Sequence, residues 1–300
     1  MVKFPCNIRL GPPGEAHLGA DASAHNWSGT SAQDGLTLWN SFRERRRAAT
    51  FLTRCKLATR SAIISFMCGR YRLSRRKQLI EEHFDSASGE EDWIPRYNIA
   101  PTQPVPVIRQ NPKEPVREMS LLRWGLIPSW VKDSSGAAKM INARSETAGT
   151  KPAFRDALKF RRCLIPADAF YEWQRTGNAK QPYCFEVNEG ELFAFAGIWD
   201  HWKDPSGNAV ETCSIMTTTP NALTSAVHNR MPVILEPDNY DLWLDPGMRD
   251  LAAASELLKP CNAKLMSCHP VSSRVNHVAN DDLECSVPVE LAQIQSGLFS

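Results

Sequence analysis

Long apolar runs are missing from this sequence. A membrane span needs about 18 or more consecutive apolar residues, and no stretch of the chain approaches that length. The first residues, MVKFPCNIRL, also lack the apolar core of a secretory signal. These absences argue against a membrane partner and lead us to expect a cytoplasmic protein, associated with the nucleoid if its source is bacterial.

Paired cysteine motifs are missing as well. The chain has nine cysteines, an odd number, and no C-x-x-C pair, so neither a disulfide framework nor a familiar zinc site is indicated. Cys261 with Cys268 and His269 does not have the ligand spacing of such zinc sites. We therefore expect free thiols, no metal and no cofactor.

A strong excess of either charge is absent over the whole chain, whose net charge is +2. The balance changes when the chain is divided at Met67. Residues 1–67 contain nine Lys and Arg against four Asp and Glu, and the remainder contains 26 against 29, a net charge of −3. Overall attraction to phosphate is therefore absent from the larger part, where nucleic-acid binding would require a local group of arginines.

Residues 1–66 show no sustained apolar period. They combine Gly, Ser, Ala and Asn with a basic run over residues 43–47. We expect this segment to be a disordered extension or the result of a misassigned start; a transit peptide is a further alternative because the later part is rich in Arg and Ser. Residues 67–300 are expected to form a single catalytic domain.

From Cys68 onward, short apolar runs alternate with Pro, Gly and Asn. This texture predicts a β-rich domain of the α+β class with antiparallel pairing. Ser74 is placed to cap a helix that carries Leu79, Ile80 and Phe84 on one face. We expect strands over residues 104–109, 121–124, 163–166, 169–173, 183–187, 192–199, 213–218 and 265–269, and further helices over residues 151–159, 221–227, 238–244 and 251–258.

Polar residues inside apolar or aromatic motifs are the candidates for chemistry. Cys68 lies in MCGRY, Asn142 in INARSET, Glu172 in FYEW and His228 in HNRMPV. Such neighbours would bury or half-bury a reactive group. Because these residues are separated by tens of positions, only the fold can bring them together.

These motifs, in this order, resemble the SRAP family, the SOS response-associated peptidases that crosslink abasic DNA. The resemblance extends over nearly all of residues 67–300 and includes YNIAP at 97–101, WGLIPSW at 124–130, AGIW at 196–199 and HPVS at 269–272. It implies a β-barrel-like sheet core with flanking helices. It also implies that Cys68, following an initiator Met, is the nucleophile and that Asn142, Glu172 and His228 complete the site.

The activity implied is covalent attachment to the aldehyde of an abasic site in single-stranded DNA, which protects the lesion in the DNA damage response. An N-terminal cysteine suits this reaction because its amine forms a Schiff base and its thiol then closes a thiazolidine ring. Cys68 must therefore be exposed, by translation from Met67 and loss of that Met or by self-cleavage, and we favour the first route. We expect a monomer with autoproteolytic and lyase activities.

Residues beside these motifs are the candidate DNA contacts. Arg70, Arg144 and Arg230 carry guanidinium groups that match phosphate oxygens, and Trp130 can stack on a base. Bacterial members of the family often have two adjacent Trp where this chain has Trp130-Val131, so a double aromatic platform is not expected. Because backbone contacts carry no sequence information, we expect little sequence preference.

Each assignment has a plainer structural alternative. Cys68 would more often be a small buried residue, His228 a structural hydrogen-bonding group, Glu172 the partner of a buried arginine, and Asn142 a turn or cap residue. The arginines would then form internal ion pairs, for example with Glu146. At the level of function, the alternatives are a non-covalent reader of single-stranded or modified DNA and a general cysteine peptidase with Cys68 as thiolate and His228 as base.

Overall fold

The computed structural model describes residues 69–89, 92–177 and 179–291, so Cys68 and the expected extension over residues 1–66 lie outside the described residues. The strands in these ranges are β1 (Tyr71–Leu73), β2 (Ser86–Ser88), β3 (Arg96–Ile99), β4 (Pro104–Gln110), β5 (Arg117–Trp124), β6 (Asn142–Arg144), β7 (Arg162–Ala167), β8 (Ala169–Thr176), β9 (Ala179–Val187), β10 (Phe193–Lys203), β11 (Ala209–Thr218), β12 (Met231–Pro232), β13 (Ile234–Leu235) and β14 (Met266–Pro270). The α-helices are α1 (Lys77–Phe84), α2 (Ser145–Ala148), α3 (Pro152–Phe160), α4 (Tyr240–Leu244) and α5 (Leu251–Glu256). Short 3-10 helices cover Ala137–Lys139, Thr224–Ala226, Pro237–Asn239, Ala263–Leu265, Ser273–Asn276 and Leu283–Cys285.

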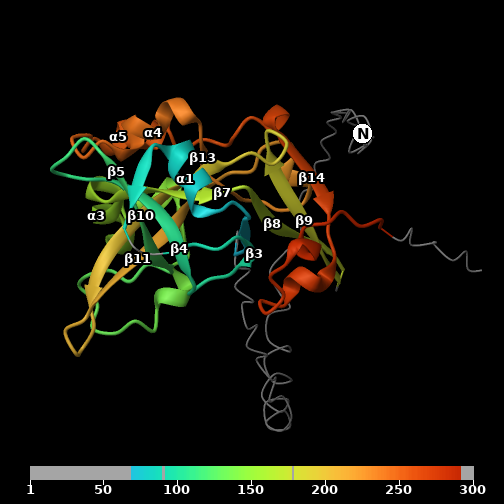
Figure 1. Ribbon diagram of the computed structural model, residues 1–300, viewed down its shortest axis with the longest axis horizontal. Helices are drawn as coiled ribbons and strands as arrows, with labels where there is room; N and C mark the ends of the chain where they lie inside the picture. The colour runs from blue at the N-terminus through green and yellow to red at the C-terminus, as the bar shows by residue number, and fades with distance from the viewer. Residues whose placement is uncertain (1–68, 90–91, 178, 292–300) are drawn as a thin grey trace, which may run out of the picture. The chain divides into compact units, whose positions relative to one another are not determined.

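Five strands close into a barrel because the first and last strands of one path, β11 and β5, pair with each other. The path runs β11-β10-β7-β4-β5 through antiparallel pairs. A parallel pairing of β11 with β5, which sets Cys213 opposite Trp124, then joins its two ends. Barrel strands β4, β10 and β11 lie on the left of Figure 1. The expected α+β class with a mainly antiparallel, barrel-like sheet core is thereby confirmed.

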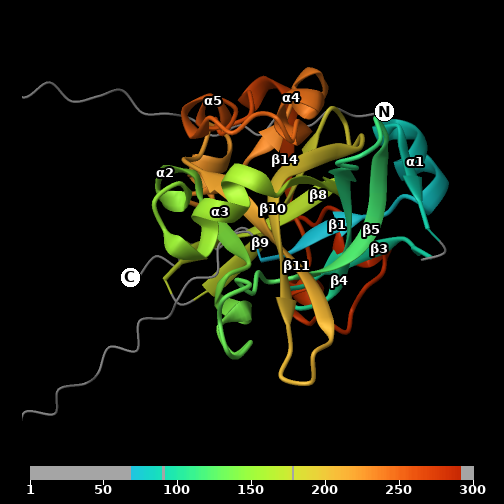
Figure 2. The ribbon, with the colours of Figure 1, turned by 90° about the vertical axis from the view of Figure 1, so that its left-hand side faces the viewer.

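A second sheet lies beside the barrel. Its order is β14-β9-β8-β1-β3, and all neighbouring strands are antiparallel. Strands β8, β9 and β14 occupy the right of Figure 1, whereas helices α1, α3, α4 and α5 lie around the strands in Figure 2. Tyr71 of β1 packs edge-on against Trp124 of β5 and Phe195 of β10, with ring centroids 5.4 and 5.6 Å apart. This aromatic contact fixes β1 against the barrel.

A buried ion pair fixes the register of β1 against β8. The Arg72 Nε donates to Asp168 Oδ1 at 2.6 Å, and the Ser74 backbone N–H and hydroxyl both donate to Asp168 Oδ2 at 2.7 Å. The Asp168 side chain is fully buried. The prediction that Ser74 caps the following helix is therefore wrong: α1 begins at Lys77 with Arg76 as its cap residue, because the buried carboxylate binds the Ser74 hydroxyl.

The Asp168→Asn substitution is expected to lower the free energy of unfolding by about 3–5 kcal/mol, because it leaves the mostly buried guanidinium of Arg72 without its closest counter-charge. Urea denaturation measures this change. Asp156→Asn is the control, since Asp156 pairs with Arg155 at the surface, where such pairs contribute little to stability. Equal losses in the two variants would contradict the importance of the buried pair.

One expected helix is wrong. In place of a helix over residues 221–227 there is only the 3-10 turn Thr224–Ala226. The Asn221 side chain explains the difference, because its Oδ1 accepts hydrogen bonds from the backbone N–H groups of Leu223 and Thr224 at 3.1 and 2.9 Å. Such local bonds compete with helix formation. Within the described ranges, no helix combines the length and apolarity that a membrane crossing requires.

Candidate active site

The strand register sets the start of β1 beside Glu172. Tyr71 pairs with Phe170, and the Tyr171 N–H donates to the Arg70 carbonyl at 3.0 Å. Continuing this antiparallel register by two positions from the Tyr71–Phe170 pair would set Gly69 opposite Glu172. Gly69 is peptide-bonded to Cys68, which itself lies outside the described residues.

Glu172 and His228 are brought together by the fold. The Glu172 side chain is 2% exposed, and its Oε1 lies 3.9 Å from Nδ1 of His228, which is itself mostly buried. They come from β8 and from the loop after the 3-10 turn Thr224–Ala226. A second contact holds the loop against the strand, since the Gln174 Nε2 donates to the Ala226 carbonyl at 2.9 Å. Two of the candidate site residues, Glu172 and His228, therefore lie together in a mostly buried position.

The hydrogen bonds of the His228 ring indicate how it carries a proton. Its Nδ1 lies 3.2 Å from the Arg230 N–H, which can only donate, and this contact fits a neutral ring with the proton on Nε2. Nδ1 also lies 3.3 Å from the Arg230 carbonyl oxygen. These two contacts hold the His228 ring against the backbone of Arg230, with Nδ1 toward Glu172.

Asn142 lies on β6, at the start of that strand. It pairs in parallel with Ile215 of β11, and its side chain is half-buried. The preceding carbonyl, that of Ile141, accepts a hydrogen bond from the Trp124 indole at 2.9 Å, and Trp124 packs against Tyr71. Through these contacts Asn142 is held relative to β1, the strand that leads back to Gly69.

Arg230 connects the His228 loop to the segment after Asn142. Its guanidinium donates to both carboxylate oxygens of Glu146, with Nη2 to Oε2 at 2.9 Å, and to the Thr217 carbonyl at 2.7 Å. The hydrogen bond from Arg230 lowers the pKa of the Glu146 carboxyl. The alternative of an internal ion pair with Glu146 therefore holds for this arginine.

The other predicted DNA contacts divide into inward and outward groups. Arg70 donates to Asn98 Oδ1 at 2.8 Å and to the Val275 carbonyl at 2.6 Å, and burial lowers the pKa of its guanidinium. Arg144 is exposed at the end of β6, and Trp130 is 64% exposed. Arg144 and Trp130 are thus accessible to a ligand, whereas Arg70 holds parts of the protein together.

Asn98 is a residue of the site region to which sequence reasoning assigned no role. It is fully buried, and its Nδ2 lies within 3.1 Å of the carbonyls of Val275, His277 and Asn280. Together with Arg70, it fixes the segment after β14 against the start of β1. The signal was present, because a polar amide inside the apolar motif YNIAP requires buried partners.

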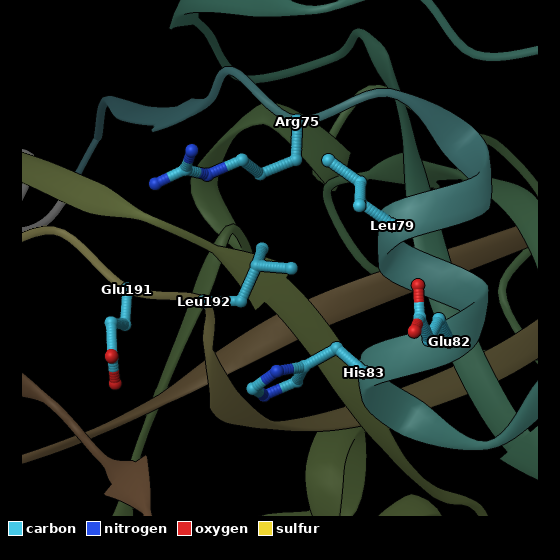
Figure 3. Close-up of a pocket in the computed structure, with 6 residues that line it drawn as sticks. All are labelled: Arg75, Leu79, Glu82, His83, Glu191 and Leu192. Atoms are coloured by element: carbon cyan, nitrogen blue, oxygen red, sulfur yellow. The ribbon is translucent and has the colours of Figure 1, made fainter.

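A pocket elsewhere in the molecule does not contain the predicted site. Its volume is about 500 Å³, and Figure 3 shows its lining residues: Arg75, Leu79, Glu82, His83, Glu191 and Leu192. Glu191 follows the end of β9 at Val187, whereas Glu172 pairs with Tyr183 in the middle of that strand. None of the predicted site residues lines this pocket. Over the described ranges, no group of three or more His, Cys, Asp or Glu residues is arranged to hold a metal ion.

A protein-family model described as SOS response associated peptidase (SRAP) matches residues 67–278. The match begins one residue before Cys68 and includes the motifs that carry Asn142, Glu172 and His228. It therefore spans every candidate site residue named above.

Related proteins and a solved structure match about the same portion of this chain as the family model. Abasic site processing protein YoqW of Bacillus subtilis (strain 168) is 43% identical over 221 residues, which are 73% of this chain and 98% of YoqW. Abasic site processing protein HMCES of Gallus gallus is 35% identical over 232 residues, 67% of this chain and 68% of HMCES. A crystal structure of a Bacteroides thetaiotaomicron protein superposes with a TM-score of 0.68 at 28% identity, covering 74% of this chain and 100% of that one.

Proposed function

This chain belongs to the SRAP family, and from that premise we propose that it processes abasic sites in single-stranded DNA through a covalent bond made by Cys68. The observation that carries the proposal is the contact between Glu172 and His228 beside the start of β1. Because Cys68 is bonded to Gly69, this register supports a position for the Cys68 nucleophile close to Glu172 and His228, the two residues that we propose exchange protons.

The proposed reaction uses both nucleophiles of an N-terminal cysteine. The amine attacks C1′ of the ring-opened sugar, and loss of one water gives an imine. The thiol sulfur then bonds to the same carbon while its proton passes to the imine nitrogen, which closes a thiazolidine ring. A free α-amine titrates near 7.7–8.0, so roughly a tenth of it is neutral at pH 7. An internal Cys68 has an amide nitrogen in its place and cannot react in this way.

The side chains around this position have complementary roles in the proposal. Glu172 accepts and returns protons during imine formation and ring closure, and His228 delivers a proton to the sugar oxygen as the ring opens. Asn142 orients the α-amine and a sugar oxygen, since an amide both donates and accepts. No step calls for a metal or a cofactor.

DNA binding in the proposal relies on the phosphate backbone. Arg144 and Trp130 are exposed and can contact the strand directly. Arg70 and Arg230 already donate to the carbonyls of Val275 and Thr217, so only their remaining N–H groups are available to phosphates. We expect little sequence preference, and we expect the protein to bind DNA as a monomer.

Exposure of Cys68 is required, and we propose translation from Met67 followed by removal of that Met rather than self-cleavage. Intact-mass measurement of the protein made from its native gene tests this step. A species that begins at Cys68 supports the proposal. A species that begins at Met1 and remains so would contradict the covalent mechanism.

Incubation with an abasic oligonucleotide, followed by denaturing electrophoresis, tests the function itself. Protein with Cys68 exposed should form a band that combines the masses of protein and DNA, whereas an undamaged oligonucleotide should not. Binding without such a band would favour the non-covalent reader, and turnover of an unrelated peptide would favour the general peptidase. A shortened oligonucleotide would indicate lyase activity.

A further inference from the structure

The hairpin of β8 and β9 extends beyond both strands that flank it. β14 pairs with β9 only from Val187 to Tyr183, and the printed pairs of β1 with β8 are those of Ala169 and Phe170. The pairs nearer the hairpin turn, from Gln174 with Gln181 onward, have only each other as neighbours among the described strands. We call residues 174–177 and 179–181 the hairpin arm.

The hairpin arm carries two cations in direct opposition. Arg175 pairs with Lys180 across the two strands, and both residues are exposed. Like charges at directly opposite positions destabilise a strand pair. The sequence of the arm contains no Asp or Glu, and among the described residues neither Arg175 nor Lys180 forms a salt bridge. An anion from another molecule would relieve this repulsion.

The hairpin arm extends from Glu172 past the N-terminal end of β1. Because the register of Tyr71 with Phe170 would set Gly69 opposite Glu172, the arm continues past the N-terminal end of β1, which Gly69 and Arg70 connect to Cys68. Arg175 lies three residues beyond Glu172 on β8, about 10 Å along an extended strand, and because side chains alternate between the two faces of a strand it lies on the face opposite to Glu172. A single strand that reaches both residues must therefore cross the edge of the hairpin. At about 3.4 Å per stacked nucleotide, the distance along β8 alone corresponds to about three nucleotides.

The base of the arm is anchored to the loop that carries His228. The Gln174 Nε2 donates to the Ala226 carbonyl at 2.9 Å, and the Tyr183 hydroxyl donates to Gln174 Oε1 at 3.3 Å. The cations of the arm are therefore held at a defined distance from Glu172 and His228.

We propose that Arg175 and Lys180 bind the phosphate backbone of the single strand that flanks the abasic nucleotide. This inference rests on the proposed function and adds a second anchoring point to it. A strand bonded at one nucleotide needs such a point to keep the flanking segment from rotating about the lesion. The two cations contact phosphates without reading bases, in keeping with little sequence preference.

The test is the salt dependence of non-covalent binding. The full chain carrying Arg175→Gln and Lys180→Gln is titrated against a fluorescent, undamaged oligothymidine at several salt concentrations. Each lost phosphate contact should lower the slope of log K against log salt by about 0.7, so the double variant should lose about 1.4. Affinity at low salt should fall in parallel.

A matched double variant separates this effect from a general loss of charge. Lys113→Gln and Lys203→Gln also remove two exposed positive charges, from the β4–β5 loop and from the end of β10. Figure 1 shows β10 and β11 on the opposite side of the molecule from β8 and β9. The slope of log K against log salt for the Lys113→Gln, Lys203→Gln variant should equal that of the unaltered protein. An unchanged slope in the arm variant, or an equal decrease in both variants, would overturn the inference.

Failure of the inference and failure of the proposed function give different results. If the unaltered protein with Cys68 exposed forms no crosslink to an abasic oligonucleotide, the covalent function is lost, while the slopes on undamaged DNA still decide the role of the arm. If it does form a crosslink and the arm variant keeps the full slope, only the inference about Arg175 and Lys180 is lost. Thermal unfolding of both double variants checks that their folds are intact.

Discussion

Replacing Cys68 by serine is expected to abolish the DNA adduct that survives denaturation, even when residue 68 is made N-terminal. The amine remains and forms the imine, but a hydroxyl replaces the more nucleophilic thiol, so ring closure is lost and water returns the imine to aldehyde. Denaturing electrophoresis after incubation with an abasic oligonucleotide measures the loss. Adding borohydride during the incubation should restore a covalent band, because it reduces the imine to a stable amine.

Two further variants separate the thiol from the amine. An alanine inserted immediately before Cys68 keeps the thiol but converts its nitrogen to an amide, so it should lose the band with and without borohydride. Cys261→Ser, which changes a half-buried thiol in another part of the fold, should crosslink like the unaltered protein. A stable band from the alanine-extended protein would contradict a thiazolidine at Cys68.

Local sequence patterns were sufficient to place most of the strands. The expected strand over residues 104–109 is β4, Pro104–Gln110, and the one over residues 213–218 lies within β11, Ala209–Thr218. Both are rich in residues that favour extended backbone, and turn-forming residues bound them. The expected helix over residues 151–159 likewise corresponds to α3, Pro152–Phe160.

Barrel closure and strand lengths were beyond such patterns. The parallel pairing of Cys213 with Trp124 depends on how the two ends of the strand path meet, a property of the whole fold. The β8–β9 hairpin extends to Thr176 and Ala179, past the apolar segments on which the prediction relied. Its end is polar, so the strand continues through backbone pairing where apolar periodicity has stopped.

The candidate site was predictable as a set of residues but not as a geometry. Glu172 and His228 stand out because each lies among apolar or aromatic neighbours, yet only the loop after Thr224–Ala226 sets them 3.9 Å apart. The arginines show the limit most clearly. Arg70 and Arg144 look equivalent in sequence, whereas Arg70 donates to the Val275 carbonyl and Arg144 is exposed. The extent of residues 67–300 as one domain stays a prediction.

Glu172→Gln is expected to slow crosslinking by roughly 10²- to 10⁴-fold, the usual contribution of a positioned acid or base. The substitution preserves the size of a side chain that is 2% exposed and removes its ability to take up a proton. Single-turnover kinetics with excess protein measure the rate, and thermal unfolding confirms that the fold is retained. Glu211→Gln is the control, because Glu211 pairs with Arg109 on the barrel and should leave the rate unchanged. Near-normal kinetics in the Glu172 variant would remove this carboxylate from the mechanism.

A double variant with His228→Gln shows whether the two groups act together. If Glu172 and His228 transfer protons in the same step across their contact, adding His228→Gln to the Glu172→Gln variant should lower the crosslinking rate far less than His228→Gln lowers it in the unaltered protein. The first substitution has then already disabled that step. If they serve separate steps, ring opening for His228 and imine formation for Glu172, the slower step should set the rate, and a proton donor such as imidazole in the buffer should rescue only the His228 variant. Equal rescue of both single variants would contradict the separate roles, because it would indicate that general acid catalysis from solution can replace either side chain.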